Sequence, residues 1–215
     1  MFHSAVRTTF IVLALAGTGS ATARAQVPDQ QKTCSELESR AFTVGTWMTH
    51  DWTGGTLNGS KTRVAVVRQD SLDRVPYYWY ELTMDDPARP TAKMTFQILV
   101  GGPSSGFTGV RTVIMKTGNM PPMRMPPETM QMFNGINVAQ MARDCQTMDA
   151  VAWEDLTVPA GKFHALHLRN PRTSLEFWIT AGPRSGIVEL KSKDGSVGVL
   201  TAQGDNAKSS MSGTP

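Results

Sequence analysis

The segment 151–190 constrains the fold more than any other part of the chain, because it reads as consecutive short strands separated by tight turns. At its centre, residues 158–163 (VPAGKF) combine a proline that cannot donate to a central ladder with a glycine that tolerates a positive φ. After this corner, Leu166 and Leu168 are two residues apart and share one face of a strand. Residues 175–180 (LEFWIT) then return after a turn. The segment therefore predicts an antiparallel meander.

The same alternation of side chains recurs in the first half of the chain. It is cleanest at 91–100 (TAKMTFQILV), where every second residue from Met94 onward is apolar, and it is repeated at 76–84 (PYYWYELTM). Further strands are predicted at 45–52, 62–69, 108–116, 186–193 and 196–203. About ten strands with little helix predict a mainly β (α+β) fold, in which one large antiparallel sheet twists and curls into a half-barrel.

Three segments depart from the strand pattern. Residues 34–42 (CSELESRAF) predict a short N-terminal helix with Ser35 as its N-cap. Residues 117–127 (TGNMPPMRMPP) hold prolines that exclude a central strand and a continuous helix, so they predict an extended loop. Residues 128–145 follow with an apolar stripe at helical spacing. We expect this helical, Pro- and Met-rich insertion to cover the concave side of the half-barrel.

The chain begins with a segment that reads as a secretory signal peptide, residues 1–25. An apolar run at 10–16 is followed by a small-residue cleavage pattern that ends at Ala25. An uncleaved N-terminal anchor is the alternative. Residues 26–203 are expected to form one domain, and the small, polar tail 204–215 to be disordered. No later segment is long and apolar enough to span a bilayer, so we expect a soluble protein of the periplasm or the extracellular medium.

Cys34 and Cys145 are the two cysteines of the sequence. In an oxidising compartment an even pair usually bonds, so a disulfide is predicted, with two separate buried thiols as the alternative. Metal binding by the pair is not expected, because no neighbouring histidine or third cysteine completes a known ligand spacing. The predicted bridge would dock the N-terminal helix on the second half of the chain.

Charge and motif content argue against several functions. The formal net charge of +3 is not gathered into a basic face, so nucleic-acid binding is not expected. The sequence holds no P-loop or GxGxxG fingerprint, and its GxSxG match at 102–106 (GPSSG) lies in an ordinary predicted turn and not at a strand-to-helix elbow. His164 and His167 are three residues apart on a predicted strand, so they face opposite sides and do not share a metal. We therefore expect no enzymatic activity and no cofactor.

Six blocks in order, YYWYELTM, KMTFQILV, VIMKTGNMPPMRMP, EDLTVPAGKFHALHL, EFWIT and GIVELKSKDG, resemble a family of uncharacterised exported bacterial proteins. That family is similar to the half-barrel superfamily of periplasmic lipoprotein carriers and lipoprotein-sorting proteins. The resemblance covers residues 45–203, and the corner at 154–163 is its most specific part. It implies a curved sheet around an apolar cavity that accepts lipid acyl chains, and it carries no catalytic residues.

Candidate ligand-binding residues come from the strand alternation and from the Met-rich insertion. The side chains expected on the more apolar face are Tyr78, Tyr80, Phe96, Ile98, Leu166 and Phe177. Those expected under a lid over the cavity are Met120, Met123, Met125, Met130 and Phe133. The sequence thus predicts an exported protein that carries or senses a hydrophobic ligand, such as a lipid or acyl chain.

Two other functions stay open at this point. The Met-rich segment 115–132 offers Met120, Met123 and Met125 as Cu(I) ligands, because thioether sulfur is a soft donor. A periplasmic copper-binding protein is therefore one alternative. The other is an envelope assembly factor that contacts a protein partner and binds no small ligand.

Overall fold

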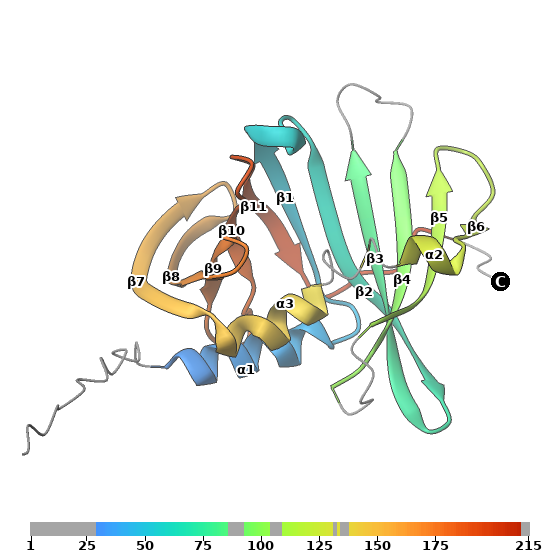
Figure 1. Ribbon diagram of the computed structural model, residues 1–215, viewed down its shortest axis with the longest axis horizontal. Helices are drawn as coiled ribbons and strands as arrows, with labels where there is room; N and C mark the ends of the chain where they lie inside the picture. Colours follow the sequence, from blue (N-terminus) through green and yellow to red (C-terminus); the bar gives the residue numbers. More distant parts are fainter. Residues whose placement is uncertain (1–28, 86–92, 104–108, 131–132, 134–137, 212–215) are drawn as a thin grey trace, which may run out of the picture.

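The computed structural model describes residues 29–85, 93–103, 109–130, 133 and 138–211, so the predicted signal peptide lies outside the described residues. These residues form one 11-stranded sheet with the order β6-β5-β4-β3-β2-β1-β11-β10-β9-β8-β7 (Figure 1). All of its strand pairs are antiparallel. The sheet curves strongly and stays open between its edge strands β6 and β7. The predicted fold class is confirmed.

The strands follow the predicted segments closely. Their bounds are β1 (Trp47–Thr53), β2 (Lys61–Leu72), β3 (Val75–Asp85), β4 (Met94–Gly101), β5 (Val110–Thr117), β6 (Met123–Arg124), β7 (Asp149–Val158), β8 (Gly161–Arg169), β9 (Glu176–Thr180), β10 (Ile187–Lys191) and β11 (Val197–Gly204). The described helices are α1 (Gln30–Ala41), η1 (Gly55–Leu57), α2 (Pro127–Met130), α3 (Val138–Asp144) and η3 (Cys145–Thr147).

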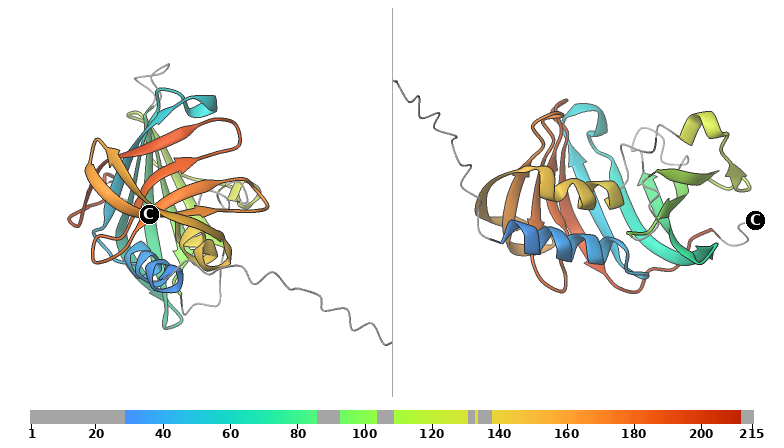
Figure 2. Two further views of the ribbon diagram at one scale, coloured as in Figure 1. Left: turned by 90° about the vertical axis from the view of Figure 1, so that its left-hand side faces the viewer. Right: turned by 60° about the horizontal axis from the view of Figure 1, so that its bottom comes forward.

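The predicted alternation separates the two faces of the sheet. On the concave face, one large cluster of buried side chains runs from Tyr80 on β3 to Phe177 on β9. The helices α1 and α3 lie side by side against this face (Figure 2), and they contribute Leu37 and Ala142 to the same cluster. The convex face carries two smaller clusters, around Trp79 and around Trp178. Most of the hydrophobic core therefore lies between the concave face and the helices.

Several contacts hold α1 against the rest of the fold. Cys34 and Cys145 form a disulfide with their Cα atoms 5.6 Å apart, which confirms the predicted bridge. The Gln30 side chain donates to the Cys145 carbonyl oxygen at 3.2 Å. At the other end of the helix, the Tyr80 hydroxyl donates to the Ala41 carbonyl oxygen. Burial raises the pKa of Tyr80 far above its usual value, so this hydroxyl keeps its proton.

The N-terminal helix begins earlier than predicted. It starts at Gln30, so Ser35 lies inside it and donates to the Gln31 carbonyl oxygen at 2.9 Å instead of capping the first turn. Asp29 occupies the N-cap and makes no side-chain cap. Short helices depend on tertiary packing, and here the first turn is stabilised by docking against residues more than a hundred positions away, which a local capping pattern does not reveal.

The Pro- and Met-rich insertion contributes to both the sheet and the helical layer. Met123 and Arg124 form β6, which pairs with β5 at the edge of the sheet, where neighbouring prolines are tolerated. The helices α2 and α3 take up parts of the predicted helix 128–145. Residues 131–132 and 134–137, between these helices, lie outside the described residues. From the later part of the insertion, α3 packs on the concave cluster.

The segment after β11 differs from the disorder predicted for 204–215. Glu81 on β3, 1% exposed, accepts hydrogen bonds from the Ser210 backbone N–H at 3.0 and 3.1 Å and from the Ser209 hydroxyl at 3.2 Å. Met211 is buried in the convex cluster around Trp79. Small, polar residues predict disorder when they are considered alone, but here a distant buried carboxylate anchors them. The last four residues lie outside the described part of the chain.

We expect Glu81→Ala to release residues 207–211 from the convex face. The change leaves the Gln97 side-chain amide, which donates to Glu81 at 3.1 Å, and the Ser210 N–H without this acceptor. Each buried group left unsatisfied costs about 1–3 kcal/mol. Amide hydrogen exchange at 207–211 should become faster, whereas Thr83→Ala on the same face of β3 should leave it unchanged. Unchanged exchange in Glu81→Ala would show that this carboxylate does not hold the segment.

Candidate functional site

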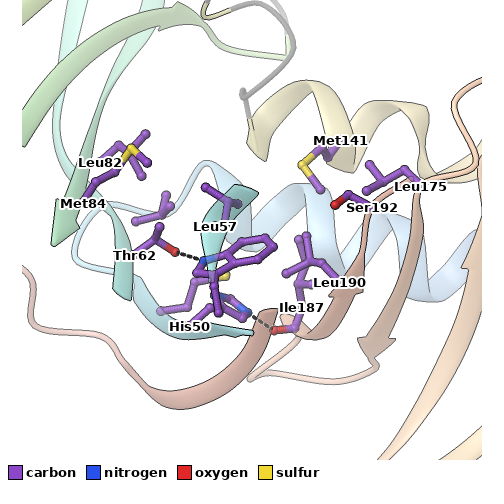
Figure 3. Close-up of a pocket in the computed structure, with 13 residues that line it drawn as sticks. His50, Leu57, Thr62, Leu82, Met84, Met141, Leu175, Ile187, Leu190 and Ser192 are labelled. Atoms are coloured by element: carbon purple, nitrogen blue, oxygen red, sulfur yellow. Dashed lines mark hydrogen bonds between the residues drawn. The ribbon is translucent and has the colours of Figure 1, made fainter. Parts of the chain in front are cut away.

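An apolar pocket of about 380 Å³ lies on the concave face near the middle of the sheet (Figure 3). Side chains of β1, β2 and β3 form one wall, residues of β10 and of the turns beside it form the facing wall, and α3 closes one side. The lining residues are Met48, His50, Trp52, Leu57, Thr62, Val64, Leu82, Met84, Met141, Leu175, Ile187, Leu190 and Ser192. Its volume falls within the range of small-molecule sites, about 300–1,000 Å³.

Strand β1 supplies the most distinctive part of the lining. Met48, His50 and Trp52 alternate along the strand, so all three side chains point to the concave face. The register pairs His50 with Thr62 on β2. The Trp52 indole N–H donates to the Thr62 hydroxyl at 2.9 Å, which fixes the ring against the pocket wall (Figure 3).

Gly198 on β11 makes room for the Trp52 ring. The two residues are paired across β1 and β11. A Cβ atom at position 198 would lie 2.9–3.0 Å from three ring atoms of Trp52, so the ring would have to move to admit it. The ring therefore takes the space that a side chain on β11 would otherwise fill. A larger residue at this position would push the indole into the pocket or break its bond to Thr62.

His50 is the one ionisable side chain among the lining residues, and it is 4% exposed. Its Nε2 lies 2.8 Å from the Ile187 carbonyl oxygen. Because a carbonyl only accepts, Nε2 carries the proton. Burial lowers the pKa of His50 below its usual 6.5, although the Ile187 bond and the Asp51 charge oppose the shift. The ring is therefore neutral at pH 7, and Nδ1 is an acceptor without a partner in the described part of the chain.

The lowered pKa of His50 predicts an acid-sensitive fold. As the pH falls below 6.5, the unfolded chain binds a proton at this residue before the folded chain does, so the free energy of unfolding falls. One such group gives a slope of at most about 1.4 kcal/mol per pH unit. The free energy of unfolding can be measured by urea denaturation at several pH values from neutral to mildly acidic. It should fall less steeply with decreasing pH in His50→Gln, whose amide can still donate to Ile187. Identical slopes in the two proteins would contradict the assignment.

The predicted cavity residues lie beside the pocket and do not line it. Those buried in the concave cluster are Tyr80, Phe96, Ile98, Phe133, Leu166 and Phe177, and those packed against it are Tyr78, Met125 and Met130. Met120 and Met123 are 56% and 57% exposed. The alternation identified the more apolar face, which is the concave one, but the pocket lies further along the strands, at Leu82 and Met84 on β3. A ligand contact at any of the predicted residues stays a prediction.

The Cu(I) alternative also stays a prediction. Met120 and Met123 project into solvent near the edge of the sheet, whereas Met125 packs against the concave cluster. Among the described residues, no group of three or more His, Cys, Asp and Glu side chains is arranged to hold a metal ion.

The other two histidines of the described residues, His164 and His167, have carboxylate partners. His164 is exposed and lies 2.7 Å from Asp155 through Nδ1. His167 is stacked on Trp178, with Glu154 and Glu176 at 3.1 and 3.0 Å from its ring nitrogens. These contacts join β7, β8 and β9 and do not face the pocket. These histidine–carboxylate contacts therefore connect neighbouring strands and are not part of the pocket.

The comparisons give no family for this chain. No family model and no curated protein matches it. Among solved structures, a predicted lipoprotein from Parabacteroides distasonis is 12% identical with a TM-score of 0.36. A predicted exported protein with a YmcC-like fold from Bacteroides fragilis is 14% identical with a TM-score of 0.35. Both alignments cover 75% of this chain and 96% of the other. Structural likeness at this level does not establish function. A function must therefore be argued from the residues of this chain.

The disulfide between Cys34 and Cys145 indicates an extracytoplasmic location, because the cytosol keeps most thiols reduced. The predicted cleavage site near Ala25 lies outside the described residues. Over the part of the chain that the structure describes, no helix has the length and apolar character needed to cross a membrane.

Proposed function

We propose that this chain is an exported binding protein that carries or senses a hydrophobic ligand in the pocket on its concave face. The supporting observation is an apolar space of about 380 Å³ that the described side chains leave unfilled. Protein interiors are normally packed as densely as organic crystals, and voids larger than a water molecule are few. An apolar molecule that enters this space gains roughly 25 cal/mol for each Å² of apolar surface removed from water.

The lining suits ligands of variable shape. Met48, Met84 and Met141 reach the pocket from β1, β3 and α3, so three flexible thioether side chains surround one space. Methionine adapts to irregular apolar surfaces because it is unbranched and polarisable. Among the described residues, no Asp, Glu, Lys or Arg lines the pocket, which favours an apolar ligand over a charged one. These features favour a lipid or another elongated hydrocarbon over a compact polar metabolite.

A titration with the neutral apolar dye Nile red tests the proposal. The protein is first stripped of bound lipid, and the dye should then bind saturably. Val64 on β2 lines the pocket, whereas Val67 on the same strand packs on the convex face. Val64→Phe should fill the space and weaken binding about tenfold or more, a loss of about 1.4 kcal/mol. Val67→Phe, the same chemical change, should bind as the wild type does.

Two outcomes would overturn the proposed function. One is the absence of saturable binding by the wild-type chain. The other is equal weakening by Val64→Phe and Val67→Phe, which would place the dye elsewhere or attribute the effect to general loss of structure. Circular dichroism of the three proteins separates these cases.

A further inference from the structure

We propose that the pocket selects an uncharged apolar molecule that bears a hydroxyl group, as a long-chain alcohol does, and that this hydroxyl bridges His50 and Thr62. The inference rests on the proposed function, since it requires the pocket to be the binding site. It adds the chemical class of the ligand and the two residues that recognise its head.

His50 supplies an acceptor. Its Nε2–H is committed to the Ile187 carbonyl oxygen at 2.8 Å, and the ring is 4% exposed. The remaining nitrogen, Nδ1, has a lone pair and no partner among the described residues. A ligand that donates a hydrogen bond can pair with this nitrogen, whereas a pure hydrocarbon that displaces water from it cannot.

Thr62 supplies a donor. Its hydroxyl oxygen accepts from the Trp52 indole N–H at 2.9 Å. An indole N–H only donates, so the hydroxyl proton of Thr62 is not used in that bond. Within the described residues no acceptor takes this proton. The hydroxyl can therefore donate to an oxygen atom of a ligand in the pocket.

The two groups are close enough to share one hydroxyl. His50 and Thr62 are direct cross-strand partners on β1 and β2, and both line the pocket (Figure 3). Such partners have Cβ atoms about 4.5–5.5 Å apart on one face of the sheet. An alcohol oxygen placed between them accepts from Thr62 and donates to His50. The hydrocarbon chain then extends towards Leu82 and Leu190, which belong to the apolar lining.

The charges near the pocket disfavour an anion. In the described part of the chain no Lys or Arg lines it, so a carboxylate there would be buried without a counter-charge from these residues, which is costly. At the rim, the Ser192 hydroxyl donates to Asp194, and bonds from Ser192 and Thr56 hold the pKa of that carboxyl well below its usual value. Asp194 therefore adds a negative charge beside the pocket. A fatty-acid anion would meet this charge and the lone pair of His50.

Three competitors with the same hydrocarbon chain separate these possibilities. Dodecanol donates and accepts, dodecyl methyl ether accepts only, and dodecanoate is an anion at neutral pH. Each is titrated against bound Nile red at concentrations below its micelle or solubility limit. We expect dodecanol to bind about tenfold more tightly than the ether and than dodecanoate, the effect of roughly one buried hydrogen bond. His50→Phe should abolish the tenfold preference for dodecanol over the ether.

The outcomes distinguish this inference from the proposed function. Equal affinity of the wild-type chain for dodecanol and the ether, or tighter binding of dodecanoate, would overturn the inference and leave a hydrophobic site in place. Failure of Nile red itself to bind would overturn the proposed function as well. Thr62→Val, which keeps the shape of the side chain, should lose affinity for dodecanol and for the ether alike. If His50→Phe does not fold, the comparison of ligands in the wild-type chain decides the question.

Discussion

Replacement of both Cys34 and Cys145 by serine should lower the free energy of unfolding by about 2–5 kcal/mol. The bond joins residues separated by 111 positions. In the chain-entropy model, a closed loop of that length restricts the unfolded chain by an amount near 4.7 kcal/mol, which is an upper figure. The bond also presses α1 onto the concave cluster, where Cys34 and Cys145 are both fully buried. The loss of unfolding free energy should therefore also include a contribution from weakened side-chain packing.

Urea denaturation under oxidising conditions measures this loss. Ser35→Ala is a suitable control, because Ser35 lies one position from Cys34 on α1 and its hydroxyl bonds only within the helix. It should change stability by less than about 0.5 kcal/mol, as surface substitutions usually do. A double cysteine variant as stable as this control would show that docking of α1 depends on its other contacts, such as those of Gln30, Arg40 and Tyr80, and not on the disulfide.

Phe177→Ala should destabilise the chain by about 3–5 kcal/mol, the usual cost of removing a buried aromatic ring. Phe177 is 1% exposed on the concave face of β9, and its register partners Leu168 and Leu190 flank it on both sides. Strand neighbours on both sides limit how far the structure can relax into the space. The ring is part of the buried concave cluster.

Leu175→Ala provides the matched comparison, just before β9. Leu175 lines the pocket and is only partly buried. Its removal enlarges an existing space, so the loss of stability should be less than half that of Phe177→Ala. Nile red binding should change more in Leu175→Ala than in folded Phe177→Ala. If urea denaturation gave equal losses of stability for the two variants, Leu175 would be packed as tightly as Phe177. It would then not border an unfilled space.

The strands and the grouping of side chains on each face could be predicted because their signal is local. Phe96 and Ile98 alternate with Thr95 and Gln97, and alternation fixes which side chains share a face whatever the partner strand is. The pocket could not be predicted in the same way. It depends on Trp52 lying over Gly198, a pairing between strands that are far apart in the sequence. Alternation along β1 groups His50 with Trp52, but it does not show that this side is concave.

Two other features were missed for a similar reason. The start of α1 depends on contacts of Gln30 with the chain after α3. The path of 205–211 depends on Glu81, a carboxylate on β3 that accepts hydrogen bonds from Ser209 and Ser210. In both cases the segment itself is polar and carries no strong pattern. A partner distant in the sequence determines its structure.

The central claim is that the concave pocket is the ligand-binding site. Methyl NMR of methionine during a Nile red titration tests it most directly, because the chain has methionines both in the pocket and away from it. Met48, Met84 and Met141 line it, whereas Met120 and Met123 are 56% and 57% exposed near the edge of the sheet. If the concave pocket is the binding site, the methyl signals of the three lining residues should shift saturably and together. The signals of Met120 and Met123 should not move. Shifts confined to these two exposed methionines, or no shift at any lining methionine, would contradict the proposed site.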